Sequence, residues 1–316
     1  MDIEEKFLKH FIKVTQQASI ATFPKIGNKN KNEVDALATD TMRKVLNKIE
    51  MRGRVVIGEG ELDEAPMLYI GEILGKNDKP EIDIAVDPLE GTNFAANNLP
   101  GALSVIAATY KNNLLHAPET YMDKIAYGPN VEEGVVDLDN NFNQNVKNLA
   151  DFKNKNVEDM SICVLDRPRH SEIIKEAKKL NVKIKLISDG DVSGAILVTN
   201  EKHGVDIFLG IGGGPEGVLA ACALDAYNCG FQGRFIFDDD NSIKRAKNMG
   251  IKDLKKKYYL KDIVKGDSIF CATGITKGEL VNGIEVLGEY FMTDTFVTHK
   301  SKNIKMNVRE KVKKIL

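Results

Sequence analysis

Two carboxylates stand three residues apart in the stretch D-I-A-V-D-P-L-E-G-T-N, residues 83–93. Apolar residues alternate with polar or small ones over 82–86, which predicts a buried strand. Pro88 lacks the N–H that a central strand needs, so we expect the strand to end there, with Asp87 and Glu90 at its carboxyl end. Clustered carboxylates repel one another unless a cation neutralises them, and Mg²⁺ and Mn²⁺ prefer such oxygen ligands. The pattern indicates either a metal site or an ordinary polar turn.

Three other predicted strands also run into acidic or glycine-rich turns. The strand at 54–58 is followed by E-G-E, the strand at 182–187 by S-D-G-D, and the strand at 205–211 by G-G-G-P-E-G. Ligands of open α/β sheets gather at the carboxyl ends of strands, although each turn taken singly could be no more than a solvated loop. The acids at these turns are Glu59, Asp189, Asp191 and Glu216.

Arginines and backbone N–H groups near these acids could bind phosphate. Arg167 and Arg169 flank Pro168, which stiffens the turn, and arginine pairs bidentately with phosphate; two surface arginines beside a helix start would be equally ordinary. Gly213 belongs to a turn that leads into a predicted helix N-terminus, where free N–H groups bind anions. His170 has no acid at motif spacing, which favours a structural role. Metal-binding acids and phosphate-binding groups together predict metal-assisted phosphoryl transfer to water.

The composition restricts the class of protein. The 316 residues, 42% hydrophobic and 28% charged, are enough for one large or two ordinary globular domains. The net charge of −2 provides no basic surface for nucleic acid. No apolar run approaches the roughly 20 residues of a membrane helix, and the acidic start M-D-I-E-E does not resemble a signal or transit peptide. The four cysteines lack C-x-x-C spacing, so we expect buried free thiols and a cytoplasmic location.

Amphipathic spacing predicts two helices early in the chain, over residues 7–18 and 34–49. Asp35 would lie in the first turn of the second helix, where it could serve a site or compensate the helix dipole. Residues 103–110 read as a strand, and Tyr121 follows in a polar turn.

The second half of the chain alternates strands and helices, as a doubly wound α/β domain does when its site lies along one edge. A polar, asparagine-rich stretch at 139–158 shows weak helical spacing at best, and a further strand is expected just before it, at 134–138. We place the boundary between two α/β domains there, giving residues 1–157 and 158–316. The strands near the C-terminus would extend the second sheet or form a subunit contact.

Seven segments resemble class II fructose-1,6-bisphosphatase, in that family's order: V-I-G-E-G-E-L-D-E-A-P-M-L-Y-I-G-E, D-I-A-V-D-P-L-E-G-T, L-H-A-P-E-T-Y-M-D-K, R-P-R-H, D-G-D-V, G-I-G-G-G-P-E-G-V and A-T-G-I-T-K-G-E-L. With the stretch 31–35 they span residues 31–280, nearly the whole chain. D-P-L-E-G-T alone also resembles the signature of inositol monophosphatases in the wider lithium-sensitive phosphatase superfamily. The long I-G-E-G-E-L-D-E-A-P-M run separates the class II enzymes from those relatives.

The resemblance implies a layered αβαβα sandwich with the site between two α/β domains, the first binding metal and the second sugar phosphate. It also implies hydrolysis of D-fructose 1,6-bisphosphate to fructose 6-phosphate and phosphate in gluconeogenesis, with two Mn²⁺ or Mg²⁺ ions. A homo-oligomer, a dimer or tetramer, is expected on the same ground.

Site residues follow from the resemblance position by position. The first metal ion would be bound by Asp35 and Glu59, and the second by Asp87, Glu90 and Glu216. The 1-phosphate would lie along Glu90, Gly91 and Thr92. The sugar bisphosphate would be held by Tyr121, Arg167, Pro168, Arg169, Asp189, Gly190, Asp191 and Gly213. The family's G-D-K-N-x-A-D motif reads K-N-K-N-E-V-D here, with Lys29 and Asn30 in place of the usual glycine and aspartate.

A two-metal mechanism is the resulting hypothesis. Two ions about 3.5–4 Å apart would clamp the 1-phosphate, while Thr92, with an acid such as Glu59 accepting its proton, orients the attacking water. Two alternatives remain open: a related phosphatase that acts on sedoheptulose 1,7-bisphosphate or an inositol phosphate, and a non-catalytic sugar-phosphate sensor on the same fold.

Overall fold

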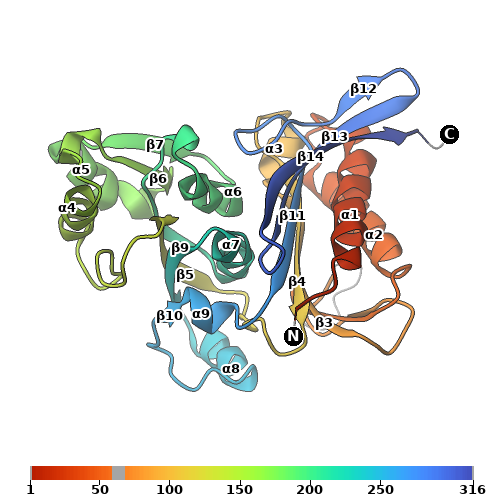
Figure 1. The fold of residues 1–316 in the computed structure, drawn as a ribbon, viewed down its shortest axis with the longest axis horizontal. Coiled ribbons are helices and arrows are strands. Elements are labelled where there is room, and N and C mark those ends of the chain that lie inside the picture. The colour runs from red at the N-terminus through yellow and green to blue at the C-terminus, as the bar shows by residue number, and fades with distance from the viewer. Residues whose placement is uncertain (1, 59–67, 315–316) are drawn as a thin grey trace. The chain divides into compact units, whose positions relative to one another are not determined.

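The computed structural model describes residues 2–58 and 68–314, and its contacts divide the chain into two compact units (Figure 1). Unit 1 consists of Met1–His116 and Val264–Leu316, and unit 2 of Ala117–Ile263. This division differs from the predicted boundary at 157/158. The chain returns to unit 1 after residue 263 because its last long strands pair with strands formed near its beginning.

Unit 1 is built on an eight-stranded sheet with the order β12-β13-β11-β4-β3-β1-β2, and β14 pairs with β13. Its neighbours are antiparallel except for β1 and β3. The sequence suggested that the C-terminal strands would extend the second sheet, but they extend the first. The elements are α1 (Lys6–Thr22), α2 (Lys31–Leu46), β1 (Arg52–Ile57), β2 (Ile73–Leu74), β3 (Glu81–Glu90), α3 (Thr92–Ala96), β4 (Leu103–Tyr110), β11 (Ser268–Gly274), β12 (Glu285–Leu287), β13 (Tyr290–His299) and β14 (Ile304–Lys313).

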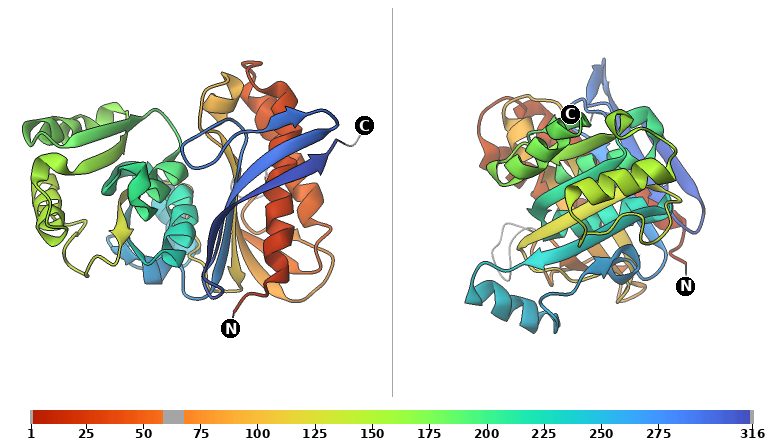
Figure 2. Two further views of the ribbon diagram at one scale, coloured as in Figure 1. Left: turned by 45° about the horizontal axis from the view of Figure 1, so that its top comes forward. Right: turned by 90° about the vertical axis from the view of Figure 1, so that its left-hand side faces the viewer.

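Helices α1 and α2 lie side by side against this sheet, α1 on β4, β11 and β13 and α2 on β3 (Figures 1 and 2). The apolar face predicted for α1 is buried, with Phe7 and Phe11 fully shielded. These side chains share one core with Met42 of α2 and Ile84 of β3. Burial of this stripe, and not helix propensity alone, holds both helices on the sheet.

Unit 2 is built on a six-stranded mixed sheet with the order β10-β9-β5-β8-β6-β7. Strands β7, β6 and β8 run parallel, whereas β5 is antiparallel to both β8 and β9. The elements are β5 (Tyr121–Pro129), α4 (Phe142–Phe152), β6 (Ser161–Leu165), α5 (Ser171–Lys179), β7 (Lys183–Ile187), α6 (Asp191–Ile196), β8 (Ile207–Gly213), α7 (Gly214–Ala226), β9 (Cys229–Ile236), α8 (Asp240–Asn248), β10 (Tyr258–Tyr259) and α9 (Leu260–Ile263).

Helices cover both faces of the second sheet (Figure 1). Helices α4 and α5 share a core with alternate residues of β5, β6 and β8. Helices α6 and α7 pack on the other face, where Phe208 of β8 meets Gly194 of α6. Unit 1 thus supplies a helix layer and a sheet, and unit 2 a sheet between two helix layers, which are the layers of the predicted αβαβα class.

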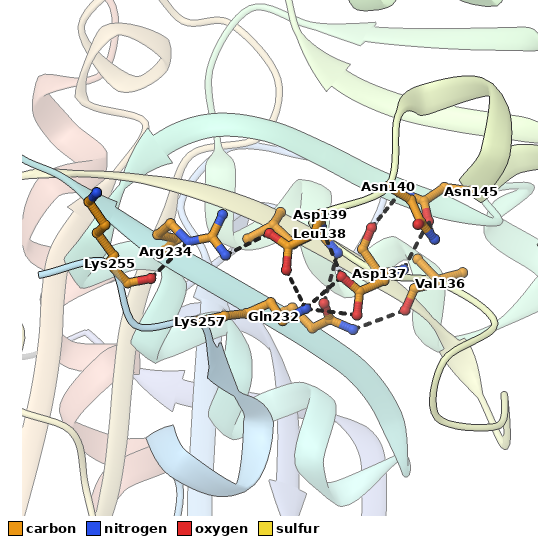
Figure 3. A network of polar contacts seen from close by, with 10 residues as sticks. All are labelled: Val136, Asp137, Leu138, Asp139, Asn140, Asn145, Gln232, Arg234, Lys255 and Lys257. Carbon is orange, nitrogen blue, oxygen red and sulfur yellow. Dashed lines mark hydrogen bonds and ion pairs between the residues drawn. The ribbon is translucent and has the colours of Figure 1, made fainter. Parts of the chain in front are cut away.

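Polar side chains replace a strand in the segment before α4 (Figure 3). The Gln232 amide of β9 donates to the Val136 carbonyl and accepts from the Leu138 N–H. Lys257 binds the carboxylates of Asp137 and Asp139. The strand predicted at 134–138 is therefore wrong, because these backbone groups bond to side chains instead of a neighbouring strand.

Helix α4 forms in the stretch that was expected to be largely irregular. Asn141 caps it by accepting a hydrogen bond from the Gln144 N–H, and Val146 and Leu149 are fully buried. Among the asparagines that suggested a linker, Asn141 caps the helix and Asn145 is buried and bonded to the backbone of Asp137.

The part of the chain that the structure describes contains no helix long and apolar enough to cross a membrane. All four cysteines are buried and none forms a disulfide, as expected from their spacing.

Candidate active site

The acidic end of β3 in unit 1 is shaped by a bulge. The prediction that Pro88 ends the strand is wrong, since β3 continues to Glu90. Asp87 pairs with Val105 of β4 and Glu90 with Leu103, so three steps on β3 match two on β4. A bulge leaves residues outside the ladder, which tolerates the missing N–H of proline and redirects neighbouring side chains.

The turn after this bulge positions Thr92. Gly91 has φ 77°, a left-handed conformation that suits glycine, and it precedes α3. The Thr92 hydroxyl donates to the Leu89 carbonyl at 3.1 Å, and the Asp87 carboxylate accepts from the Leu89 N–H at 3.1 Å. Backbone contacts thus hold both side chains at the end of β3.

Helix α2 packs at the same end of the sheet. Val34 shares a buried cluster with Leu89 and Phe94, which places the neighbouring Asp35 on the helix that meets the acidic turn. Glu33 occupies the first helical turn of α2, and Asp35 lies beyond it, so dipole compensation explains Asp35 less well. Glu59 lies outside the described residues.

The predicted sugar-phosphate residues of unit 2 lie at the end of its sheet where the parallel strands β6, β7 and β8 reach their carboxyl ends. This carboxyl end is the edge of the sheet that carries the candidate site. Because β5 is antiparallel to β8, Tyr121 pairs directly with Gly213. The sequence suggested that Tyr121 lies in a polar turn, but it is the first residue of the central strand β5. The turns after β6, β7 and β8 reach the same edge and carry Arg167, Pro168, Arg169, Asp189, Gly190, Asp191 and Glu216.

The two arginines at this edge are oriented but remain open to solvent. The Arg169 Nε donates to the Ile211 carbonyl at 2.9 Å, and its guanidinium lies 5.1 Å from the centre of the Tyr121 ring. Arg167 lies 4.0 Å from the Asp189 carboxylate. A guanidinium that is held in place and partly exposed can still bind a phosphate bidentately.

His170 is structural, as its sequence context favoured. The Ile211 N–H donates to its Nε2 at 2.8 Å, which leaves Nδ1 to donate to the Leu165 carbonyl at 2.7 Å. Burial lowers the pKa of His170, in keeping with a neutral ring that joins the ends of β6 and β8. Gly210 makes room for it, since a Cβ there would lie 2.7 Å from Nε2.

A shielded charge cluster occupies the centre of the edge. Lys124 of β5 donates to Asp191 Oδ2 and, at 2.8 Å, to the Gly213 carbonyl. Asp191 Oδ1 and Glu216 Oε2 are shielded and have no hydrogen-bond partner among the described residues. Burial, together with the nearby Asp191, raises the pKa of Glu216. Sequence reasoning missed Lys124, although it stands in the Y-M-D-K segment between strand-forming residues.

The donors fit a hard divalent cation, because all are carboxylates and the Glu216 oxygen without a partner is what a bound cation would satisfy. Of the five predicted ligands, Asp35, Asp87 and Glu90 belong to unit 1 and Glu216 to unit 2. Within residues 2–58 and 68–314, no three or more His, Cys, Asp or Glu side chains gather closely enough to hold an ion. The ligand set stays a prediction.

Comparison with solved structures gives two partial similarities. An extragenic suppressor from Pyrococcus furiosus is 17% identical, with a TM-score of 0.32 over 62% of this chain and 69% of that one. An IMPase from Thermotoga maritima is 12% identical, with a TM-score of 0.31 over 61% and 72%.

Comparison of sequences covers almost the whole chain. The family described as "Bacterial fructose-1,6-bisphosphatase, glpX-encoded" matches residues 5–311. Fructose-1,6-bisphosphatase 2 class 2 of Escherichia coli K12 is 42% identical, covering 90% of this chain and 92% of that protein. A D-fructose 1,6-bisphosphatase class 2/sedoheptulose 1,7-bisphosphatase of Prochlorococcus marinus MIT 9301 is 38% identical over 93% and 92%. The chain therefore belongs to the class II fructose-1,6-bisphosphatase family.

Proposed function

We propose that this chain hydrolyses the 1-phosphate of D-fructose 1,6-bisphosphate, giving fructose 6-phosphate and phosphate, as expected in gluconeogenesis. The observation that carries the proposal is the edge of the unit 2 sheet, where two partly exposed arginines stand beside a shielded lysine–carboxylate cluster. Such an edge offers cationic partners to a phosphate and acceptors to sugar hydroxyls. Family membership supports the same reaction.

Unit 2 would bind the sugar and its distal phosphate. Arg167 and Arg169 are the groups for the phosphate, and Tyr121 stacks against Arg169 and limits its orientations. Asp189 and Asp191 would accept hydrogen bonds from the sugar hydroxyls. These contacts exist in the ground state and the transition state alike, so they would lower KM more than they raise kcat.

Five carboxylates would hold the metal ions: Asp35, Glu59, Asp87, Glu90 and Glu216. Two divalent cations bound there, Mn²⁺ or Mg²⁺, would neutralise phosphate charge and lower the pKa of a water molecule. The chain's own part is to place these acids at the ends of a bulged strand and of a glycine-rich turn.

Thr92 would orient the water. Its proton is donated to the Leu89 carbonyl, so the lone pairs of Oγ1 can accept a hydrogen bond from a water molecule. An acid, for which Glu59 is the candidate, would take up the proton that the water loses as it attacks phosphorus opposite the leaving oxygen.

Sedoheptulose 1,7-bisphosphate is a second candidate substrate. Relatives from Prochlorococcus and Trichodesmium, the latter 40% identical, carry both activities in their names. We further expect a cytoplasmic homo-oligomer, a dimer or tetramer; the four buried cysteines, none of which forms a disulfide, support a reducing compartment.

The test is phosphate release from fructose 1,6-bisphosphate with Mn²⁺, with Mg²⁺ and with EDTA, followed by identification of the sugar product. We expect metal-dependent release of one phosphate and formation of fructose 6-phosphate. Sedoheptulose 1,7-bisphosphate and inositol 1-phosphate, assayed in parallel, separate the related phosphatases. Ligand binding without hydrolysis under both metals would refute the proposal and favour a sensor.

A further inference from the structure

Lys124 is a shielded charge in the middle of a central strand. Only 2% of its side chain is exposed, and β5 is covered on its two edges by β8 and β9. Lysine is almost never buried unless its ammonium is paired, because desolvation of the charge is costly. Its position therefore needs a reason beyond packing.

Glycines on two neighbouring elements make room for this lysine. A Cβ on Gly217 of α7 would lie 3.1 Å from Lys124 Cδ, and a Cβ on Gly212 of β8 would fall on the Asp191 carboxylate and lie 3.0 Å from Lys124 Nζ. Both distances are shorter than ordinary Cβ contacts. The backbone around the side chain is thus built to let the ammonium reach the edge of the sheet.

The ammonium divides its contacts unequally between two acids. Lys124 forms its ion pair with Asp191 and donates also to the Gly213 carbonyl. Within the part of the chain that the structure describes, Asp191 Oδ1 and Glu216 Oε2 are shielded and lack a hydrogen-bond partner. Two carboxylates with one ammonium leave a net charge of about −1 if all three are ionised, and the direct pairing leaves this charge nearer to Glu216.

We propose that Lys124 is a positioning residue that assigns different roles to two neighbouring carboxylates. Asp191, fixed and neutralised by Lys124, keeps one oxygen to accept a hydrogen bond from an uncharged sugar hydroxyl. Glu216, to which Lys124 forms no direct ion pair, takes the divalent cation. This inference rests on the proposed function, because it divides sugar and metal binding between residues of that one site.

The proposal predicts that removal of the ammonium changes the affinities for the sugar phosphate and for the cation differently. Sugar-phosphate binding weakens, because Asp191 loses the group that holds it. Cation binding stays as tight or becomes tighter, because the cluster becomes more negative. A lysine that only stabilises the fold would weaken both together when replaced.

The experiment compares the wild-type enzyme with Lys124→Met, Lys124→Gln and the control Lys153→Met. Lys153 is partly buried, with 18% of its side chain exposed, and it is also paired with a carboxylate, that of Asp206, but at the opposite end of β8. Mn²⁺ affinity is measured without substrate, from the EPR signal of free Mn²⁺, and KM and kcat are measured with fructose 1,6-bisphosphate at saturating Mn²⁺.

For Lys124→Met we expect KM to rise about tenfold to hundredfold, the range for a lost charge-assisted hydrogen bond, with kcat nearly unchanged. Its Mn²⁺ affinity should equal or exceed that of the wild type. Lys124→Gln keeps a hydrogen-bond donor but no charge, so its KM should rise less than that of Lys124→Met. Lys153→Met should match the wild type in KM and in Mn²⁺ affinity.

Weaker Mn²⁺ binding by Lys124→Met, or an unchanged KM, would overturn the proposal. If circular dichroism shows that Lys124→Met does not fold, the same two measurements on Lys124→Gln decide. Absence of phosphate release by the wild type would instead refute the proposed function, and the Mn²⁺ affinities would still test the role of Lys124.

Discussion

Each unit buries a charged cluster, and the two clusters differ in how completely their carboxylate oxygens are paired. In unit 1, Asp267 accepts hydrogen bonds from the Ile3 N–H at 2.9 Å and from the Ser301 N–H and hydroxyl at 2.8 and 2.7 Å, and lies 3.0 Å from His299 Nε2. Burial would raise its pKa, but the hydrogen bonds from His299 and Ser301 hold the pKa at about 2. Both carboxylate oxygens are satisfied.

The cluster of Lys124, Asp191 and Glu216 in unit 2 leaves two shielded carboxylate oxygens without partners. Buried polar groups are normally hydrogen-bonded, so an unpaired one in a folded protein asks for an explanation, such as an absent ligand. We therefore expect Asp267, whose two carboxylate oxygens are paired, to serve stability, and the partly paired acids Asp191 and Glu216 to serve the site. Substitutions in the Asp267 cluster should then change the free energy of unfolding, and substitutions in the Lys124 cluster should change substrate binding or catalysis.

The largest expected effect on catalysis comes from Thr92→Ala. Loss of the hydroxyl should lower kcat by about 10²–10⁴-fold, the range for a positioned proton-transfer group, with little change in Mn²⁺ affinity or in the urea midpoint. Thr92→Ser, which keeps the hydroxyl, is the matched control. Equal kcat values for wild type and Thr92→Ala would remove Thr92 from the site.

The largest expected effect on stability comes from Asp267→Asn. Removing a buried charge from its partners should lower the free energy of unfolding by roughly 2–5 kcal/mol, measured by urea denaturation. The kcat of the folded fraction should stay close to that of the wild type. A stable but inactive variant would contradict the assignment of this cluster to stability.

A smaller effect is expected from Gly213→Ala, which disturbs the partly paired cluster. Gly213 has φ −66° and ψ 142°, which alanine adopts without strain, but its Cβ would fall on the Glu216 carboxylate. The carboxylate must move, so we expect kcat/KM to fall about tenfold or more at nearly unchanged stability. Gly128→Ala, at the far end of β5 with no contact closer than 3.4 Å, should leave both quantities unchanged.

Arg169→Ala tests the substrate side of the same edge. Losing a guanidinium that binds phosphate should raise KM about tenfold and leave kcat nearly constant. Arg309→Ala, which removes an exposed arginine paired with Glu285 in unit 1, is the control. A fall in kcat without a change in KM would move Arg169 from substrate binding to the chemical step.

The smallest effect concerns His170, a fully paired group among the site residues. Its pKa lies below the ordinary 6.5 because burial disfavours the charged ring. Its contribution to stability is therefore complete above pH 6.5 and is lost as the pH falls through the lowered pKa. Between pH 8 and pH 5 the wild type should lose more unfolding free energy than His170→Gln, whose side chain does not titrate. Parallel pH profiles would refute this role.

The apolar stripes of α1 and α5 formed where expected, because their apolar residues recur at the helical period. Strands β4 and β6 also formed where expected, because each is a short, nearly continuous apolar run that is buried on both faces. Strands β5 and β9 were missed because they lie in the interior of a sheet covered by helices on both faces, and their glycines and charges break any period.

The site was predicted in part for a similar reason. Acids and arginines at strand ends were recognisable from type and spacing, and the structure brings those of unit 2 to one edge. Lys124 was not recognisable, since nothing in the letters Y-M-D-K separates a buried lysine from a solvated one. The bulge at Pro88 also depends on how β4 pairs with β3, which a single strand does not encode.

The excursion of the chain through unit 2 has a consequence for the order of folding. Strand β4 needs β11 as a neighbour, and Thr109 pairs with Ser268 only after all of Ala117–Ile263 has been synthesised. Contacts between residues so distant in sequence are slow to form, because a long loop must close first. On the ribosome, unit 2 can therefore complete its own sheet before β11 has been synthesised and can pair with β4. The sheet of unit 1, whose first strands are synthesised early, is completed only by the C-terminal strands.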